Sequence, residues 1–309
     1  EPKVRTLKGV FTRADGTTTV TNPIVLIFGA GYDNEVEDQP SGTVRTVTKG
    51  RGVYVVEAET GELIKFLQPP TGVTKYSFPA DTTPLDMEND GYVDRIYAGD
   101  TNANIFRWNL NNATVTNIND SSYWTTYHVA ALGDVINDGG SDARKLHFAP
   151  EVLPFKLSGV VKVMVLFGTG DREKPLGNLD GSSIKTLSGL GGCPAYFTGS
   201  NPYPITGSQS GTSYTYFGPR VRDQFFGVVD TGGTTIVEAN LQYVNQDSSN
   251  LAPFDVNSTT YRGWRIRLKT DPDGSQGDTR GEEKSVNAAK VVGGVTFFGI
   301  LGYRPPGLW

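Results

Sequence analysis

The chain is poor in the residues that most often build catalytic and transition-metal centres. Its 309 residues include one cysteine, two histidines and two methionines. The single cysteine, Cys193, excludes a disulfide within the chain, and because it has no partner, a structural thiol is favoured over a reactive one. His128 and His147 lie in separate strand-like contexts without ligand spacing or a Ser-His-Asp or Cys-His pattern, which favours structural histidines. The sequence therefore predicts a protein that is not an enzyme.

A strong excess of charge and long apolar runs are missing as well. The 28 basic and 33 acidic residues leave a formal net charge of −5, and no long basic run occurs, which argues against nucleic acid as a partner. No apolar run approaches the roughly 20 residues of a membrane-spanning helix, and no stretch reads as a signal peptide. Because the chain begins at Glu1 without a methionine, we expect it to be a piece of a longer, secreted protein.

Helical periodicity is almost absent, and the composition indicates an all-β protein. The chain has 38 glycines and 18 prolines, and short runs of β-branched and aromatic residues recur between Gly, Asp and Asn turns. The clearest expected strands are Ile24–Phe28, Gly52–Glu57, Arg95–Ala98, Ile105–Leu110, Val160–Phe167, Gln224–Val229, Thr235–Val237, Gly263–Leu268 and Lys290–Gly299. The runs Ile24–Phe28 and Val163–Phe167 are apolar throughout, which predicts strands buried on both faces.

Three segments share a plan of strand, acidic or Thr/Gly turn, and returning strand. They are Val53–Ile64, Ile96–Trp108 and Phe225–Val237. Such units, repeated every few tens of residues, are typical of β-propeller blades, here most like the quinoprotein type. At about 40–45 residues per blade, 309 residues can hold up to seven blades. Because the spacing is irregular, we expect residues 1–309 to form one domain of about five to seven blades with large insertions. The alternative is one long β-sandwich or two.

Three polar segments interrupt the strand pattern and are expected to be long surface insertions that can carry partner contacts. They are Tyr32–Lys49, Gly181–Tyr216 and Asp271–Glu283. The first contains four acidic residues, Asp33, Glu35, Glu37 and Asp38.

Two glycine-rich loops follow apolar strands, at Phe28–Asp33 and Gly168–Pro175. Such loops can cradle phosphate, but a nucleotide site also needs a helix N-terminus directly after the loop. Lys174-Pro175-Leu176 does not start a helix in that register, so both loops are interpreted as tight structural loops.

The segment Asp86–Asp94 has the strongest pattern for binding a ligand. Its acidic residues Asp86, Glu88, Asp90 and Asp94 occupy positions 1, 3, 5 and 9, and Gly91 occupies position 6. This spacing suits calcium, with the backbone carbonyl of Tyr92 as a further ligand. An EF-hand is excluded because position 12 is Tyr97 and a strand follows. The alternative is a solvated acidic turn, but four carboxylates this close repel one another unless a cation neutralises them.

Taken together, these segments resemble the C-terminal domain of the PilY/PilC family of type IV pilus biogenesis and adhesion proteins. The matching segments, in order, are Phe28–Asn34, Arg51–Gly61, the acidic loop, Tyr97–Asp100, Phe106–Leu110, Phe167–Leu176, Gly263–Leu268, Gly281–Lys284 and Val291–Phe298. They span most of the chain.

The resemblance implies a modified, quinoprotein-like β-propeller that is extracytoplasmic, at the outer membrane, the cell surface or the pilus tip. It also implies calcium bound by Asp86, Glu88, Asp90, the Tyr92 carbonyl and Asp94, although Glu88 departs from the usual Asp or Asn. The segment before Phe28 is short for this family domain, so we expect early blades either to be missing or to lie upstream in a parent protein.

Three functions are compatible with this resemblance and the calcium loop. The leading one is a calcium-regulated, non-enzymatic factor that controls pilus extension, retraction and twitching motility, with minor pilins or the pilus tip as partners. The second is an adhesin with structural calcium and a host-cell surface receptor. The third, a quinoprotein dehydrogenase, is disfavoured because its calcium is held by several blades and its adjacent-cysteine pair is missing here.

Overall fold

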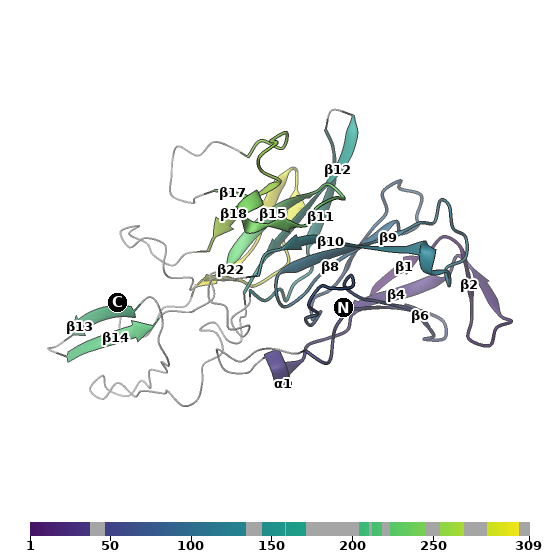
Figure 1. Cartoon of the computed structure of the whole chain (residues 1–309), viewed down its shortest axis with the longest axis horizontal. Coiled ribbons are helices and arrows are strands. Elements are labelled where there is room, and N and C mark those ends of the chain that lie inside the picture. Colours follow the sequence, from purple (N-terminus) through teal and green to yellow (C-terminus); the bar gives the residue numbers. More distant parts are fainter. Residues whose placement is uncertain are drawn as a thin grey trace.

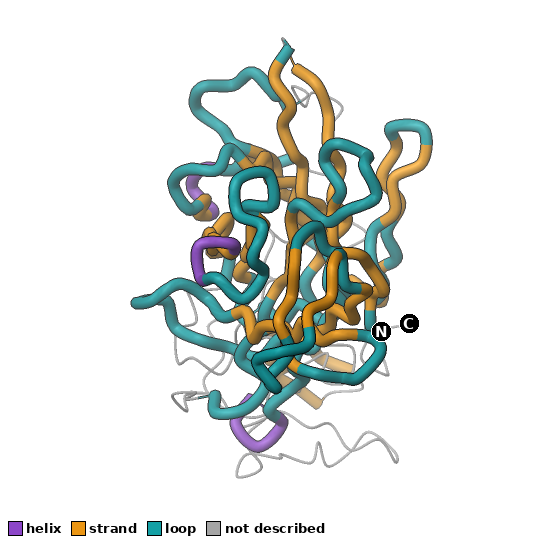
Figure 2. The backbone as a smooth tube through the Cα atoms, turned by 90° about the vertical axis from the view of Figure 1, so that its right-hand side faces the viewer, coloured by secondary structure: helices purple, strands orange, loops and turns teal. Residues whose placement is uncertain are grey.

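The chain is almost entirely β-structure in its described part. The computed structural model describes residues 1–37, 47–133, 144–157, 159–170, 204–209, 212–217, 223–244, 254–268 and 283–302. Its helical segments are one turn each: α1 (Asn34–Glu37) and the 3-10 helices η1 (Ser121–Tyr123) and η3 (Glu238–Asn240). Figure 2 shows strands and loops making up nearly everything else. The predicted all-β class is confirmed.

Three sheets form the body of the molecule. The first has the order β1 (Lys3–Thr6), β4 (Ile24–Gly29), β5 (Val53–Glu57), β6 (Leu63–Leu67). The second has the order β16 (Ile236–Val237), β10 (Trp124–Ala131), β9 (Asn104–Leu110), β8 (Arg95–Gly99), β7 (Thr83–Leu85). The third has the order β11 (Glu151–Leu157), β12 (Val160–Gly168), β15 (Gln224–Asp230), β18 (Gly263–Arg267), β17 (Gln242–Tyr243).

Four strand pairs accompany these sheets. They are β2 (Val10–Thr12) with β3 (Thr19–Thr21), β13 (Pro204–Gln209) with β14 (Thr212–Phe217), β19 (Glu283–Ser285) with β22 (Ile300–Gly302), and β20 (Lys290–Val292) with β21 (Val295–Phe297). The sheets of the described residues do not close into a ring, so five to seven blades stays a prediction.

The three sheets follow one another along the long axis, with the second in the middle (Figure 1). Alternate residues of the second sheet therefore enter different cores. Ile96, Phe106 and Trp108 pack in the core shared with the first sheet. Tyr97 and Ile105 pack in the core shared with the third sheet. The middle sheet is thus buried on both faces.

Eight of the nine expected strands match observed ones to within one or two residues, and the ninth is wrong. Lys290–Gly299 is not one strand but the hairpin β20–β21. Gly293 and Gly294, at φ 58° and 81°, form its turn, because glycine takes such angles without steric cost.

The repeat plan holds for two of its three units. β5–β6 and β8–β9 are the expected hairpins. The third unit is wrong, because β15 pairs with β12 and β18 in the third sheet, whereas β16 pairs in parallel with β10 in the second. A connection of a few residues therefore joins the two sheets.

Burial of the two apolar runs also differs. The run within β12 is buried on nearly every residue, as expected. The run in β4 alternates instead: Val25 and Ile27 are buried, whereas Ile24 is exposed, because only one face of the first sheet packs on a neighbouring sheet.

A buried ion pair between Arg107 and Asp230 connects the second and third sheets. The Asp230 carboxylate at the end of β15 accepts hydrogen bonds from Arg107 Nη1 at 2.5 Å and from the Tyr97 hydroxyl at 2.8 Å. Tyr97 and Arg107 are register partners on β8 and β9, and the Tyr127 ring covers the guanidinium at 4.1 Å. Burial, and then the Asp230 charge, raise the pKa of Tyr97, which keeps its hydroxyl a donor.

Replacing Asp230 with alanine should destabilise the fold strongly. Arg107 and Asp230 side chains are 4% and 2% exposed, and a buried charge left without its partner costs about 3–5 kcal/mol. Urea unfolding of Asp230→Ala measures this loss. The control is Lys290→Met, which removes the exposed Lys290–Glu151 pair and should cost less than about 1 kcal/mol. Equal losses in the two variants would contradict the assignment of a structural ion pair.

Candidate metal loop

The acidic loop 86–94 connects two antiparallel strands at the edge of the second sheet. It runs from β7 to β8, with Leu85 and Arg95 as register partners. Val93 N donates to the Thr6 carbonyl at 3.1 Å, so the loop also contacts β1 of the first sheet. The strand expected after the loop is present as β8. The loop therefore lies where the first and second sheets meet.

The backbone of the loop is tightly curled, as its glycine predicted. Asn89 and Gly91 have φ of 59° and 90°, in the left-handed region that glycine and asparagine enter most readily. The Asp86 carboxylate accepts from the N–H groups of Asp90 and Gly91, at 3.2 and 2.8 Å. The first and middle parts of the loop are thereby brought together.

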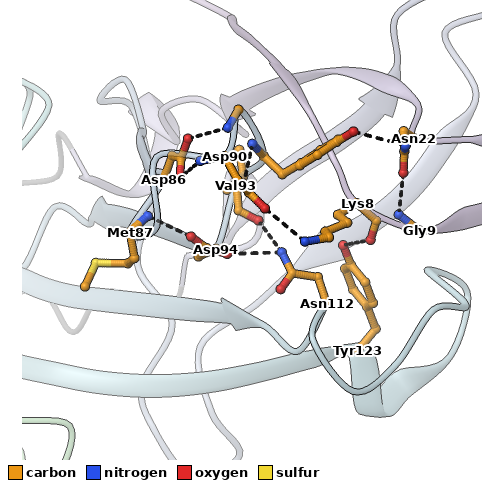
Figure 3. Close-up of polar contacts among 12 residues, drawn as sticks. Lys8, Gly9, Asn22, Asp86, Met87, Asp90, Val93, Asp94, Asn112 and Tyr123 are labelled. Atoms are coloured by element: carbon orange, nitrogen blue, oxygen red, sulfur yellow. Dashed lines mark hydrogen bonds and ion pairs between the residues drawn. The ribbon is translucent and has the colours of Figure 1, made fainter.

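The last acid of the loop joins it to a neighbouring turn. Asp94 Oδ2 accepts from Met87 N at 2.7 Å, and Asp94 Oδ1 accepts from Asn112 Nδ2 at 3.1 Å (Figure 3). Asn112 Nδ2 also reaches the Val93 carbonyl at 3.2 Å. No local pattern in the sequence predicts the contact with Asn112, because this residue lies 18 residues beyond Asp94.

A lysine from the first sheet's side of the molecule reaches the centre of the loop. Lys8 Nζ donates to Asp90 Oδ2 at 2.9 Å and lies 5.6 Å from the centre of the Tyr92 ring. Asp90 Oδ1 accepts from Tyr92 N at 3.1 Å. The hydrogen bond from Lys8 holds the pKa of Asp90 below its usual value, and Asp90 in turn raises the pKa of Lys8. The Asp90 carboxylate therefore already attracts a positive group.

The donor set fits a hard cation such as calcium. Asp86, Glu88, Asp90, Asp94 and the Tyr92 carbonyl supply only oxygen. Each carboxylate oxygen of Asp86, Asp90 and Asp94 has a second lone pair beyond its present hydrogen bond. Glu88 is exposed at the outer edge of the loop. Among the described residues, no three acidic, histidine or cysteine side chains are gathered around one point, so binding requires local rearrangement of these side chains.

The remaining sequence candidates take structural positions where they are described. His128 stacks on Phe106 at 4.8 Å, its Nε2 lies 3.1 Å from Asn104 Oδ1, and burial lowers its pKa. Amides of both glycine loops serve the backbone: Gly31 N donates to the Phe78 carbonyl and Thr169 N to the Gln224 carbonyl. Cys193, Asp38, residues 171–175 and residues 271–282 lie outside the described residues.

One expectation about the insertion Tyr32–Lys49 is wrong. Asp33 and Glu37, expected at the surface, are fully buried. Asp33 Oδ2 accepts from the amides of Thr48 and Lys49 at 2.8 and 3.0 Å. Burial opposes ionisation of Asp33, but these donors hold its pKa below the ordinary value. Asp33 therefore holds the two ends of the insertion together.

Glu37 continues this buried polar group towards the second sheet. Glu37 Oε1 accepts from Ser77 N at 3.1 Å and from the Thr101 hydroxyl at 2.5 Å. Next to Thr101, in the β8–β9 turn, Asp100 accepts from Asn102 N and Asn104 N, at 2.8 and 3.0 Å. Complete burial, with a smaller contribution from the Glu37 charge, raises the pKa of Asp100 to about 7 despite these donors.

Comparison with known proteins points to one fold. No family model matches the chain, and no curated protein matches it. Among solved structures, it is similar to the Pseudomonas aeruginosa PilY1 C-terminal domain, with a TM-score of 0.57 and 16% sequence identity. The match covers 98% of this chain and 55% of that one, so the chain spans about half the length of the solved domain. No described helix is long and apolar enough to cross a membrane. The chain therefore has a PilY1-like β fold.

Asp100 should make stability depend on pH in an unusual direction. Its folded pKa lies above the ordinary value of about 3.9, so the folded state holds the proton more tightly. Its contribution to the free energy of unfolding is therefore fully present below about pH 4, is lost as pH rises from about 4 to about 7, and stays low above that.

Asp100→Asn removes this titration while keeping the side-chain shape. In urea unfolding, we expect wild type to lose a few kcal/mol relative to this variant between pH 5 and pH 8. Asp15→Asn is the control, because the hydrogen bond from Thr18 already holds the pKa of Asp15 far below this range. A constant difference between wild type and Asp100→Asn across this range would contradict the prediction.

Proposed function

We propose that this chain is a calcium-binding, non-enzymatic factor of type IV pilus biogenesis that regulates pilus extension and retraction and hence twitching motility. The observation that carries the proposal is the position of the all-oxygen loop 86–94. The loop connects β7 to β8 and contacts β1 within a PilY1-like fold. The family resemblance of the sequence supports the pilus role.

The proposal gives the chain a propeller-like, extracytoplasmic domain of the quinoprotein type, at the outer membrane, the cell surface or the pilus tip. Minor pilins or the pilus tip are the proposed partners. Calcium supplies two positive charges that neutralise the repulsion among Asp86, Glu88, Asp90 and Asp94. The Tyr92 carbonyl completes the proposed ligand set.

The loop's own contacts explain how ion binding could act on a larger part of the molecule. Val93 N donates a hydrogen bond to the Thr6 carbonyl of β1, and Asp94 accepts one from Asn112, which follows the end of β9. A conformation that gathers the carboxylates is stabilised by RT ln(1 + [L]/Kd), whereas other conformations are not. Free calcium near the dissociation constant therefore shifts the population between two arrangements of this junction.

Calcium binding is tested by titration calorimetry on the purified chain. Wild type should bind one calcium, and Asp90→Ala should weaken binding at least tenfold, because it removes the central ligand of the loop. Asp15→Ala is the matched control: like Asp90, Asp15 is a turn aspartate that accepts from backbone amides, here those of Thr17 and Thr18, but it lies outside the loop. Absence of binding by wild type, or unchanged binding by Asp90→Ala, would refute the calcium proposal.

The pilus role is tested with the same substitutions in the full parent protein. In cells that lack the native copy, we expect Asp15→Ala to restore calcium-dependent twitching and surface pili. Asp90→Ala should restore neither their calcium dependence nor the normal pilus number. Normal twitching of the Asp90→Ala strain at low and high calcium would contradict the regulatory role.

An adhesin function is the second candidate. The insertion Gly181–Tyr216 contains the hairpin β13–β14, which pairs with no other sheet of the described residues. Such a separate hairpin is a suitable contact for a host-cell surface receptor. Deleting residues 181–216 should reduce adherence and leave pilus number unchanged if this function holds. Loss of pili would instead assign the insertion to biogenesis.

A further inference from the structure

The Lys8 ammonium is a positive charge of the protein itself at the centre of the acidic loop. It comes from a segment 82 residues before Asp90. Both oxygens of the Asp90 carboxylate accept hydrogen bonds: Oδ2 accepts from Lys8 Nζ, and Oδ1 accepts from Tyr92 N. Any cation that uses Asp90 as a ligand must therefore share this carboxylate with Lys8 or displace it.

Sharing is unfavourable because the two cations repel each other. The Lys8 ammonium and a divalent ion, both bound to one carboxylate, would lie only a few ångströms apart. The Asp90 and Lys8 side chains are 30% and 45% exposed, so solvent can take up the ammonium once it leaves. Displacement is therefore the favoured outcome.

The Lys8 backbone is fixed, so only its side chain can move away. The Tyr123 hydroxyl donates to the Lys8 carbonyl at 3.0 Å, and Gly9 N donates to Asn22 Oδ1 at 3.0 Å. Asn22 Nδ2 in turn donates to the Tyr92 hydroxyl at 3.2 Å. Figure 3 shows Lys8 between these fixed groups and the loop. Its flexible four-carbon stem allows the ammonium to swing out without moving the chain.

We propose that Lys8 is a built-in competitor for the cation at Asp90, so that calcium binding must break the ion pair that ties the loop to the segment after β1. This inference rests on the proposed calcium function and adds its regulation. Calcium then binds only those molecules in which Lys8 has left Asp90. The observed calcium affinity therefore equals the affinity of a loop without Lys8 multiplied by the fraction of such molecules. Lys8 also gives the junction two exclusive states, one held by the ammonium and one by calcium.

The test measures calcium affinity by calorimetry in four proteins: wild type, Lys8→Met, Lys8→Arg and Lys3→Met. Lys8→Met keeps the apolar stem and should bind calcium about two- to fivefold more tightly, as expected for the loss of an exposed ion pair. Lys8→Arg keeps the charge and should resemble wild type. Lys3→Met removes the same charge from β1, where Lys3 pairs with Asp81 and not with the loop, and should also resemble wild type.

A second readout follows the ammonium directly. In wild type with carbon-13 dimethylated lysines, calcium should shift the Lys8 signal, which is assigned by its absence in Lys8→Arg, and should leave the Lys3 signal in place. Equal affinities of wild type and Lys8→Met, or an unmoved Lys8 signal while calcium binds, would overturn the competitor role and leave the calcium proposal intact. No calcium binding by either wild type or Lys8→Met would overturn both.

Discussion

Residues along a strand alternate between the two faces of a sheet, and in the second sheet both faces must pack on another sheet. Phe106 and Trp108 of β9 pack towards the first sheet. Ile105 packs towards the third sheet, and Arg107 pairs with Asp230 of that sheet. Because the period is two, a one-residue slip of β9 would exchange these sets and place a guanidinium in the apolar core shared with the first sheet. The stacking of the sheets therefore depends on this register.

The stacking of the first and second sheets also determines the position of the acidic loop. β7 and β8 form the edge of the second sheet nearest the first, so their connecting loop is brought against Thr6 and Lys8. A similar loop on an isolated hairpin would have neither contact. The chemistry proposed for the loop thus depends on two elements that are far from it in sequence, the segment after β1 and the turn that carries Asn112.

This dependence explains what the sequence could and could not predict. Strands such as Ile105–Leu110 and the curl at Gly91 follow from local composition, and both were predicted. Lys8 and Asn112 reach the loop only through tertiary packing and have no local signature. Asp33 and Glu37 are expected at the surface because polar insertions between strands are usually solvated. Both are buried instead, because backbone amides and hydroxyls from other segments donate hydrogen bonds to them.

The parallel pairing of β16 with β10 has a consequence for the order of folding. Ala130 pairs with Ile236, so this edge of the second sheet is completed by residues more than 100 positions later in the chain. During synthesis β10 remains an open edge until β16 has emerged, which follows β11, β12 and β15 of the third sheet in the chain. Contacts of such long separation form slowly, and an unpaired strand edge can associate with other chains in the meantime. The short segment after β15 thus ends a period in which the nascent protein is most exposed to misassembly.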